Sequence, residues 1–242
     1  MQSFTVVLDA CVLVPITAAD TLLRLAEREM YRPVWSERIL EEAKRAIARL
    51  HPELSAVQID HRFVSMNRAF EDASVSGWVS LEGSIVLPDE DDRHVVACAL
   101  AAGADAIVTN NVRDFPETTL APLSIEVITL DDFLLDIFDL APEEFAAVIR
   151  EQVADAKHPS LSPKDVLRNL AAAGAPEAAA QLRPFFSEAD ISTPGTARPW
   201  ASPAPGMIVK ADDDGSSCQL WRCRELATLR LQAVQTPSQS RT

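Results

Sequence analysis

The sequence predicts an α/β fold in which helices flank a central, mainly parallel sheet, followed by a small helical extension. Short apolar runs without polar alternation recur along the first 140 residues, as is typical of strands buried on both faces. Segments with helical spacing of apolar residues separate these runs, and this alternation favours a parallel sheet. The chain of 242 residues is 48% hydrophobic, which suffices for one full domain and a smaller appendage.

The first predicted elements follow one another closely. Residues 4–8 form an apolar, β-branched run that predicts a strand, and this run ends at Asp9. Apolar residues then recur at helical spacing over residues 21–30, until Pro33 interrupts the pattern. Two more helices are expected, each opening with a serine suited to an N-cap: Ser36 and Ser55.

The middle of the chain alternates in the same way. We expect a second buried strand at residues 84–88, then a helix with four acids in its first turn, residues 89–92, that ends at Gly103. Negative charge suits a helix N-terminus because of the helix dipole. Later strands are predicted at residues 104–109 and 125–130, and helices at residues 131–138 and from Pro142.

The composition changes after about residue 157. Ser-Pro-Lys-Asp at residues 162–165 looks like a helix cap, and a further helix is predicted at residues 175–186. Beyond residue 187 the chain is rich in Pro, Ser and Thr without periodicity, which predicts disorder. We therefore expect a domain at 1–140, a helical extension at 141–187 and a disordered tail at 188–242.

Charge is distributed unevenly along the chain. The net charge is −14, and residues 1–150 hold 26 acids against 12 bases. Binding of nucleic acid mainly by electrostatics requires the opposite sign, so broad coating of DNA is disfavoured. A local basic rim remains open, and its candidates recur on three predicted helices: Arg24, Arg28, Arg32, Lys44, Arg45, Arg49, Arg62 and Arg68.

The cysteines and the N-terminal segment bear on the cellular compartment of the protein. Four scattered cysteines do not form a disulfide framework, and the N-terminal apolar stretch is interrupted by Asp9 and Pro15. Neither a signal peptide nor a membrane span has this pattern. We expect a soluble, reduced, cytoplasmic protein without membrane contact.

Acids and amides follow three of the predicted strands. Asp9 follows the first, residues 89–92 follow the second, and Asn110, Asn111 and Asp114 follow the third. Ligands of parallel sheets bind beyond the carboxyl ends of the strands, so these side chains are expected to converge. Clustered carboxylates repel one another unless a cation neutralises them, and Mg²⁺ or Mn²⁺ prefers oxygen ligands. The pattern predicts a divalent-metal site, although each acid alone also fits a helix cap, a turn or a solvated face.

Four ordered segments resemble the motifs of PIN-domain ribonucleases, with VapC-like toxins as the most similar subgroup. The segments are residues 7–10, 36–42, 91–99 and 107–116. The resemblance covers about residues 4–140, and the helical piece at 161–186 is similar to the C-terminal extension of some of these toxins. It implies a PIN-like three-layer fold.

The resemblance implies site residues by their position in these segments. Asp9, Glu42 and Asp92 correspond to three acids of the family site. Neighbouring acids remain alternatives at two of these positions. Glu41 is an alternative to Glu42, and Asp89 and Asp91 are alternatives to Asp92.

The fourth position departs from the family pattern. Many members have an acid where this chain has Asn111, and the nearest acid is Asp114, so the sequence leaves open which of the two completes the site. The resemblance implies that Asp9, Asp92 and Asp114 bind Mg²⁺ or Mn²⁺, as one ion or two, and that Glu42 and Asp114 orient water or a second ion.

The implied function is metal-dependent hydrolysis of RNA phosphodiester bonds by the toxin of a toxin–antitoxin pair. The implied partners are the RNA substrate, a cognate antitoxin and a second copy in a homodimer. Further candidates carry two interpretations each. Thr109 is a strand residue or a hydrogen-bond donor to a carboxylate, and His94 is an exposed helix residue or a phosphate contact. Trp35 and Trp78 belong to the core or stack on a base.

Two other functions fit part of the pattern. A haloacid-dehalogenase-like phosphatase also has a nucleophilic Asp after the first strand, but it needs a second Asp where this chain has Cys11. A catalytically silent PIN scaffold that acts by binding is favoured by Asn111 and disfavoured by the retained acids Asp9, Glu42 and Asp92.

Overall fold

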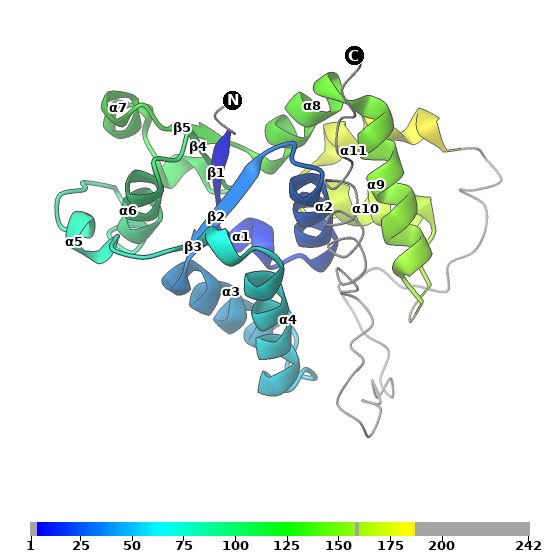
Figure 1. Ribbon diagram of the computed structural model, residues 1–242, viewed down its shortest axis with the longest axis horizontal. Helices are drawn as coiled ribbons and strands as arrows, with labels where there is room; N and C mark the ends of the chain where they lie inside the picture. The colour runs from blue at the N-terminus through cyan, green and yellow to red at the C-terminus, as the bar shows by residue number, and fades with distance from the viewer. Residues whose placement is uncertain (1–3, 158–159, 187–242) are drawn as a thin grey trace, which may run out of the picture.

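A computed structural model of the chain describes residues 4–157 and 160–186 (Figure 1). The expected tail at 188–242 lies outside these described residues. Within them, the strands form one parallel sheet in the order β3-β2-β1-β4-β5. The strands are β1 (Thr5–Leu8), β2 (Arg32–Ser36), β3 (Ser74–Val75), β4 (Ala106–Val108) and β5 (Glu126–Ile128).

The helices account for most of the remaining described chain. The α-helices are α1 (Ala10–Leu13), α2 (Ile16–Glu27), α3 (Glu37–Leu50), α4 (Ala56–Ala69), α5 (Val79–Glu82), α6 (Arg93–Ala102), α7 (Glu117–Leu120), α8 (Leu130–Leu140), α9 (Pro142–Asp155), α10 (Pro163–Ala172) and α11 (Pro176–Leu182). Short 3₁₀ turns are η1 (Glu71–Ala73), η2 (Val112–Asp114), η3 (Ala121–Leu123) and η4 (Arg183–Phe185).

Strand β1 is the centre of the sheet and the point where the chain changes direction. It pairs with β2 on one side, with Val7 opposite Val34, and with β4 on the other, with Val7 opposite Ile107. The chain first proceeds from β1 to β2 and β3, then returns across β1 to build β4 and β5. A parallel sheet with this order has a topological switch point beside β1, and its crevice lies at the carboxyl ends of the strands.

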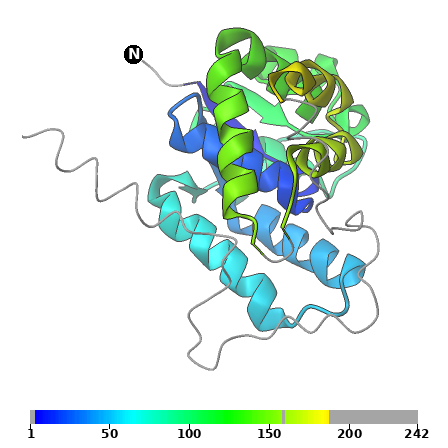
Figure 2. The same ribbon diagram turned by 90° about the vertical axis from the view of Figure 1, so that its right-hand side faces the viewer.

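The helices form layers on both sides of the sheet. Helix α6 packs on the strands on one side and α2 lies on the other, so the predicted three-layer α/β fold is confirmed (Figure 1). Figure 2 shows α9 running along α2, which attaches the C-terminal helices to the first domain.

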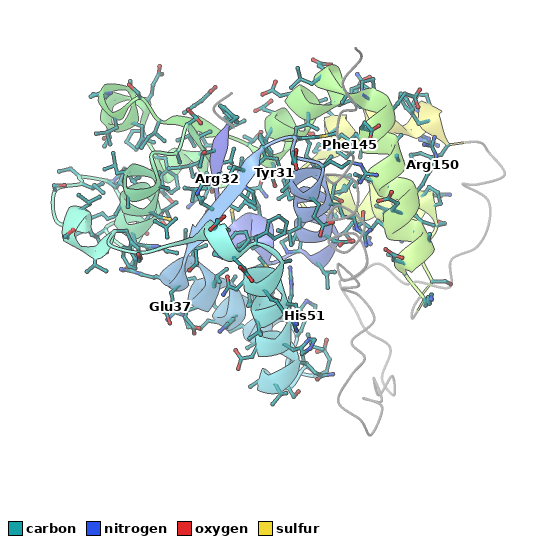
Figure 3. All side chains as sticks on the ribbon, in the orientation of Figure 1. Tyr31, Arg32, Glu37, His51, Phe145 and Arg150 are labelled. Atoms are coloured by element: carbon teal, nitrogen blue, oxygen red, sulfur yellow. The ribbon has the colours of Figure 1, made fainter. Side chains whose placement is uncertain are left out.

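One core runs through both parts of the described chain. Tyr31 and Phe145, labelled in Figure 3, are buried, and the Tyr31 ring packs edge-on against Phe133 of α8 with centroids 4.9 Å apart. Val166 and Leu170 of α10 belong to the same cluster of buried apolar side chains. The helical extension is therefore packed onto the first domain through its core.

Local helix signals in the sequence are confirmed by the structure. Ser36 and Ser55 are N-caps of α3 and α4, and Ser162 forms a capping box with Asp165 at the start of α10. Gly103 ends α6 in the left-handed conformation with φ of 59°. No described helix is long and apolar enough to cross a membrane.

The strand predicted at residues 84–88 is wrong. This segment is a turn followed by irregular chain that pairs with no strand, with Ile85 and Leu87 buried and Val86 73% exposed. Asp92 therefore follows a loop and is the N-cap residue of α6. The sheet instead contains β2 and β3, which the sequence did not indicate because Pro33 argues against a strand interior and β3 has only two residues.

Candidate active site

Asp9 holds a carboxylate at the switch point of the sheet. It follows β1 and is the N-cap of α1, where Oδ1 accepts the Ala10 N–H at 2.6 Å. Its Oδ2 accepts a hydrogen bond from Thr109 Oγ1 at 2.7 Å, which confirms the predicted contact between Thr109 and a carboxylate. Because Thr109 follows β4, this bond joins the carboxyl ends of two neighbouring strands. Asp9 is 8% exposed, so its orientation is fixed.

Asp92 lies in the electrostatic field of the same acids. Partial burial raises the pKa of Asp92, the negative charges of Asp9, Asp89 and Asp114 act in the same direction, and against the opposing effect of His94 the pKa reaches about 6. Asp9 and Asp114 are therefore close enough to influence Asp92, although their segments are far apart in the sequence. Of the rivals, Asp91 has a side chain that is 93% exposed and interacts with Arg38.

The loop after β4 links the candidates for the fourth position. The Asn111 N–H donates to Thr109 Oγ1 at 3.0 Å, and the Asn111 amide donates to the Asp114 carboxylate in a short hydrogen bond. The two residues were open alternatives in the sequence, but the structure places them in contact. Asn111 orients Asp114, and Asp114 contributes the charge that reaches Asp92.

Glu42 is joined to this cluster through a buried histidine. Glu42 Oε2 lies 3.0 Å from His94 Nε2, and Oε1 lies 3.4 Å from Arg38 Nε. Burial acts to raise the pKa of Glu42, but His94 and Arg38 outweigh it, so the pKa is lowered. The rival Glu41 is half exposed and pairs with Lys44 at 2.7 Å. Glu42 therefore faces inward, whereas Glu41 faces solvent.

The structure contradicts both interpretations of His94 that the sequence suggested. It is neither exposed nor placed to contact phosphate, because its side chain is 0% exposed. Nε2 is near Glu42 without alignment for a regular hydrogen bond, and Nδ1 is buried without a partner among the described residues. The face that α6 turns to α3 could not be read from the sequence, because apolar residues surround His94 on the helix.

An open cavity of about 610 Å³ lies beside Glu42. Arg38 spans it, donating to Glu82 at 2.7 Å and to the Asp91 carbonyl at 3.2 Å. Trp78 lines the same cavity and lies 6.1 Å from the His94 ring, measured between centroids. Trp35, by contrast, is fully buried and belongs to the core.

Comparison with known proteins identifies the fold family of these residues. The PIN domain family model matches residues 5–113, which include Asp9, Glu42, Asp92 and Asn111. The first part of the chain, residues 5–113, is therefore similar to PIN domains. A second family model, the VapC50 C-terminal domain, matches residues 130–184 of the chain. The resemblance to a VapC-like PIN domain with a C-terminal extension is thereby confirmed.

One curated relative is similar over part of its length. A protein of Mycobacterium tuberculosis (strain ATCC 25618 / H37Rv) named "Putative ribonuclease VapC50" is 40% identical over 95 residues, which are 39% of this chain and 56% of that protein. The chain thus matches about half the length of this relative. No solved structure matches the chain significantly.

Three candidates for the predicted basic rim make other contacts. Arg24 of α2 and its C-cap residue Arg28 form ion pairs with acids of α9, Asp155 at 3.0 Å and Glu151 at 2.8 Å. Arg62 is buried and donates to the carbonyls at the end of α1. These cations therefore hold helices together. Arg45 is two-thirds exposed and lies beside the Glu42 cavity.

The donor set of the PIN-domain site suits a hard divalent cation. Asp9, Asp92 and Asp114 offer carboxylate oxygens, and the raised pKa of Asp92 reflects its burial first and the negative charge of its neighbours second. Mg²⁺ and Mn²⁺ prefer such ligands. In residues 4–157 and 160–186, however, no three His, Cys, Asp or Glu side chains are close enough to enclose an ion. The described acids therefore do not form a closed ligand set.

Proposed function

We propose that this PIN-domain protein is a metal-dependent endoribonuclease and the toxin of a toxin–antitoxin pair acting in the cytoplasm. The observation that carries the proposal is the buried Asp9 carboxylate, which Thr109 holds at the switch point of the sheet and whose charge acts on Asp92 together with that of Asp114. The relative named as a ribonuclease supports the activity, and the VapC50 C-terminal domain match supports the toxin role. A cognate antitoxin and a homodimer belong to this proposal.

In this proposal Asp9, Asp92 and Asp114 hold the Mg²⁺ or Mn²⁺. The bound ion supplies Lewis acidity toward the scissile phosphoryl oxygen and lowers the pKa of a water molecule. Thr109 keeps Asp9 in its rotamer through the 2.7 Å hydrogen bond. Glu42, whose lowered pKa keeps it ionised at neutral pH, orients a water or a second ion. Asn111 positions the Asp114 carboxylate.

The first test is cleavage of RNA by the full chain with Mg²⁺ or Mn²⁺ and with excess chelator. Asp9→Asn is expected to lower kcat at least about 100-fold, because the Lewis-acid role of a metal is worth several kcal/mol and each tenfold is about 1.4 kcal/mol. The variant is expected to fold, since an Asn oxygen still accepts part of the hydrogen bonding that Asp9 receives from Ala10, Cys11 and Thr109.

A matched variant controls for the loss of one charge. Asp139→Asn makes the same chemical change on the exposed end of α8, which contributes no residue to the site, and is expected to cleave like the wild type. Equal cleavage by Asp9→Asn, or full cleavage in excess chelator, would contradict the metal-dependent mechanism. No cleavage by any of the proteins would favour the silent scaffold.

A further inference from the structure

The turn between α10 and α11 contacts the loop that carries the candidate acids. The Asn110 side-chain amide donates to the carbonyl of Ala173 at 2.8 Å. Asn110 comes directly after Thr109, whereas Ala173 belongs to the C-terminal extension. A residue beside the proposed active site is therefore held by a segment that lies outside the PIN-domain match.

Gly174 permits this contact through its missing side chain. A Cβ added at Gly174 would lie 2.8 Å from Asn110 Nδ2 and 2.9 Å from its Oδ1. Gly174 also has φ of +105°, a conformation that strains other residues. Two independent features thus require glycine at the position where the extension approaches Asn110.

Asn110 is connected to the acids through the backbone and through Cys11. Its N–H donates to Cys11 Sγ at 3.2 Å, and the same sulfur lies 3.1 Å from Asp9 Oδ2. The next residue, Asn111, binds Thr109 and Asp114. A shift of Asn110 is therefore transmitted in one direction towards Asp9 and in the other towards Asp114.

The turn is anchored well enough to hold Asn110. At the start of α10, Ser162 and Asp165 form a buried capping box, and Leu170 near its end is fully buried. The first N–H groups of α11 donate to the Asp131 carboxylate, at 3.1 Å from Glu177 and 2.9 Å from Ala178. Fixed helices on both sides leave the turn little freedom.

We propose that the Ala173–Gly174 turn is a positioning element of the active site. It holds Asn110, a positioning residue, so that Asn111 and Asp114 keep the arrangement needed for cleavage. The extension thereby contributes to the rate of the reaction as well as to the stability of the fold. This inference rests on the proposed ribonuclease activity.

The test compares Asn110→Ala, Gly174→Ala and the double variant with the wild type. Each single change is expected to lower kcat for RNA cleavage about 10-fold with little change in KM, as for other residues that orient ligating groups. In the double variant the loss is expected to equal that of Asn110→Ala rather than the product of the two, because the added methyl group no longer meets the Asn110 side chain. Asn110→Ala introduces no backbone strain and keeps the test decisive if Gly174→Ala does not fold.

Gln152→Ala is the matched control in the extension. It removes two buried hydrogen bonds between α9 and α2, to Thr21 and to the Thr17 carbonyl, but none at the Ala173–Gly174 turn, so it is expected to lower the melting temperature while kcat stays at the wild-type value. Asn110→Ala and Gly174→Ala with normal kcat would overturn the inference, as would an equal loss in Gln152→Ala.

Hydrogen exchange provides a readout that does not depend on activity. The amides at positions 110 and 111 are expected to exchange faster in Asn110→Ala and Gly174→Ala, but not in Gln152→Ala. If the wild type cleaves no RNA, the proposed function fails while exchange still tests the positioning. Unchanged exchange at both amides would overturn the positioning role even if the protein is an active ribonuclease.

Discussion

Among single residues, the pairing of Glu42 with His94 has the clearest chemical consequence. The Glu42 side chain is 26% exposed and lies against the His94 ring, which is 0% exposed. The ring therefore restricts the Glu42 carboxylate from the interior of the protein. Arg38 fixes it from the cavity side. Glu42 can orient a water molecule in one direction because these two neighbours restrict its own rotation.

Replacement of His94 by side chains of similar size tests this pairing. His94→Leu removes the nitrogen that faces Glu42 and is expected to lower kcat about 10-fold, whereas His94→Gln keeps a donor and is expected to retain most of the activity. Steady-state cleavage assays, corrected for the folded fraction by circular dichroism, measure the difference. Equal activity of the two variants would show that the ring serves only for packing.

The residues of the site differ in how far the sequence predicts them. Asp9 could be predicted because an acid directly after a buried strand needs a functional reason, and Thr109 because it ends the neighbouring strand. The burial of His94 and the contact of Asn110 with Ala173 could not be predicted from the sequence, since both depend on how distant helices pack.

Among the elements, α2 and α9 are joined by charges that are partly removed from water. The Asp20 side chain is 13% exposed and lies 3.1 Å from Nε of Arg24. The Nη2 of the same arginine pairs with Asp155 of α9. Burial raises the pKa of Asp20 to about 6, despite the opposing charge of Arg24. Ionised Asp20 therefore costs the folded state free energy at neutral pH.

This shift predicts a pH dependence with a definite sign. Because the pKa of Asp20 is higher in the folded state than in the unfolded state, folding takes up a proton and stability rises as pH falls through 6 towards 4. Relative to Asp20→Asn, which does not titrate, the wild type is expected to gain about 2 kcal/mol between pH 7.5 and 4.5. Urea unfolding of both proteins measures this difference, and a constant or falling difference would contradict the raised pKa.

Elements defined by neighbouring residues could be predicted from the sequence. The serine caps at Ser36, Ser55 and Ser162 use hydrogen bonds within three residues, so the local sequence contains them. Strand β2 forms because β1 pairs with it, and the run at 84–88 stays unpaired because no strand lies beside it. Pairing depends on the whole sheet, which a local pattern does not contain.

For the whole molecule, the excess negative charge predicts a response to metal ions. A ligand that binds only the folded state raises the free energy of unfolding, by about 2.7 kcal/mol when its concentration is 100 times its Kd. For a chain of this size, that gain raises the melting temperature by roughly 5–10 °C. Millimolar Mn²⁺ at pH 7.5, above the pKa of Asp92, is therefore expected to raise the melting temperature by several degrees. Differential scanning calorimetry tests this, with Asp9→Asn as the variant in which the shift is reduced. An identical shift in both proteins would place the ion elsewhere.

The central position of β1 also determines when the site can exist during synthesis. Asp9 leaves the ribosome early, but the strand that carries Thr109 is made about 100 residues later, and Gly174 later still. A nascent chain shorter than about 110 residues cannot join these segments, whatever its N-terminal half has folded into. The proposed ribonuclease therefore cannot act on RNA before the segment that contains Thr109 and Asp114 has been translated. Because the acids come from opposite ends of the PIN domain, translation itself delays the activity.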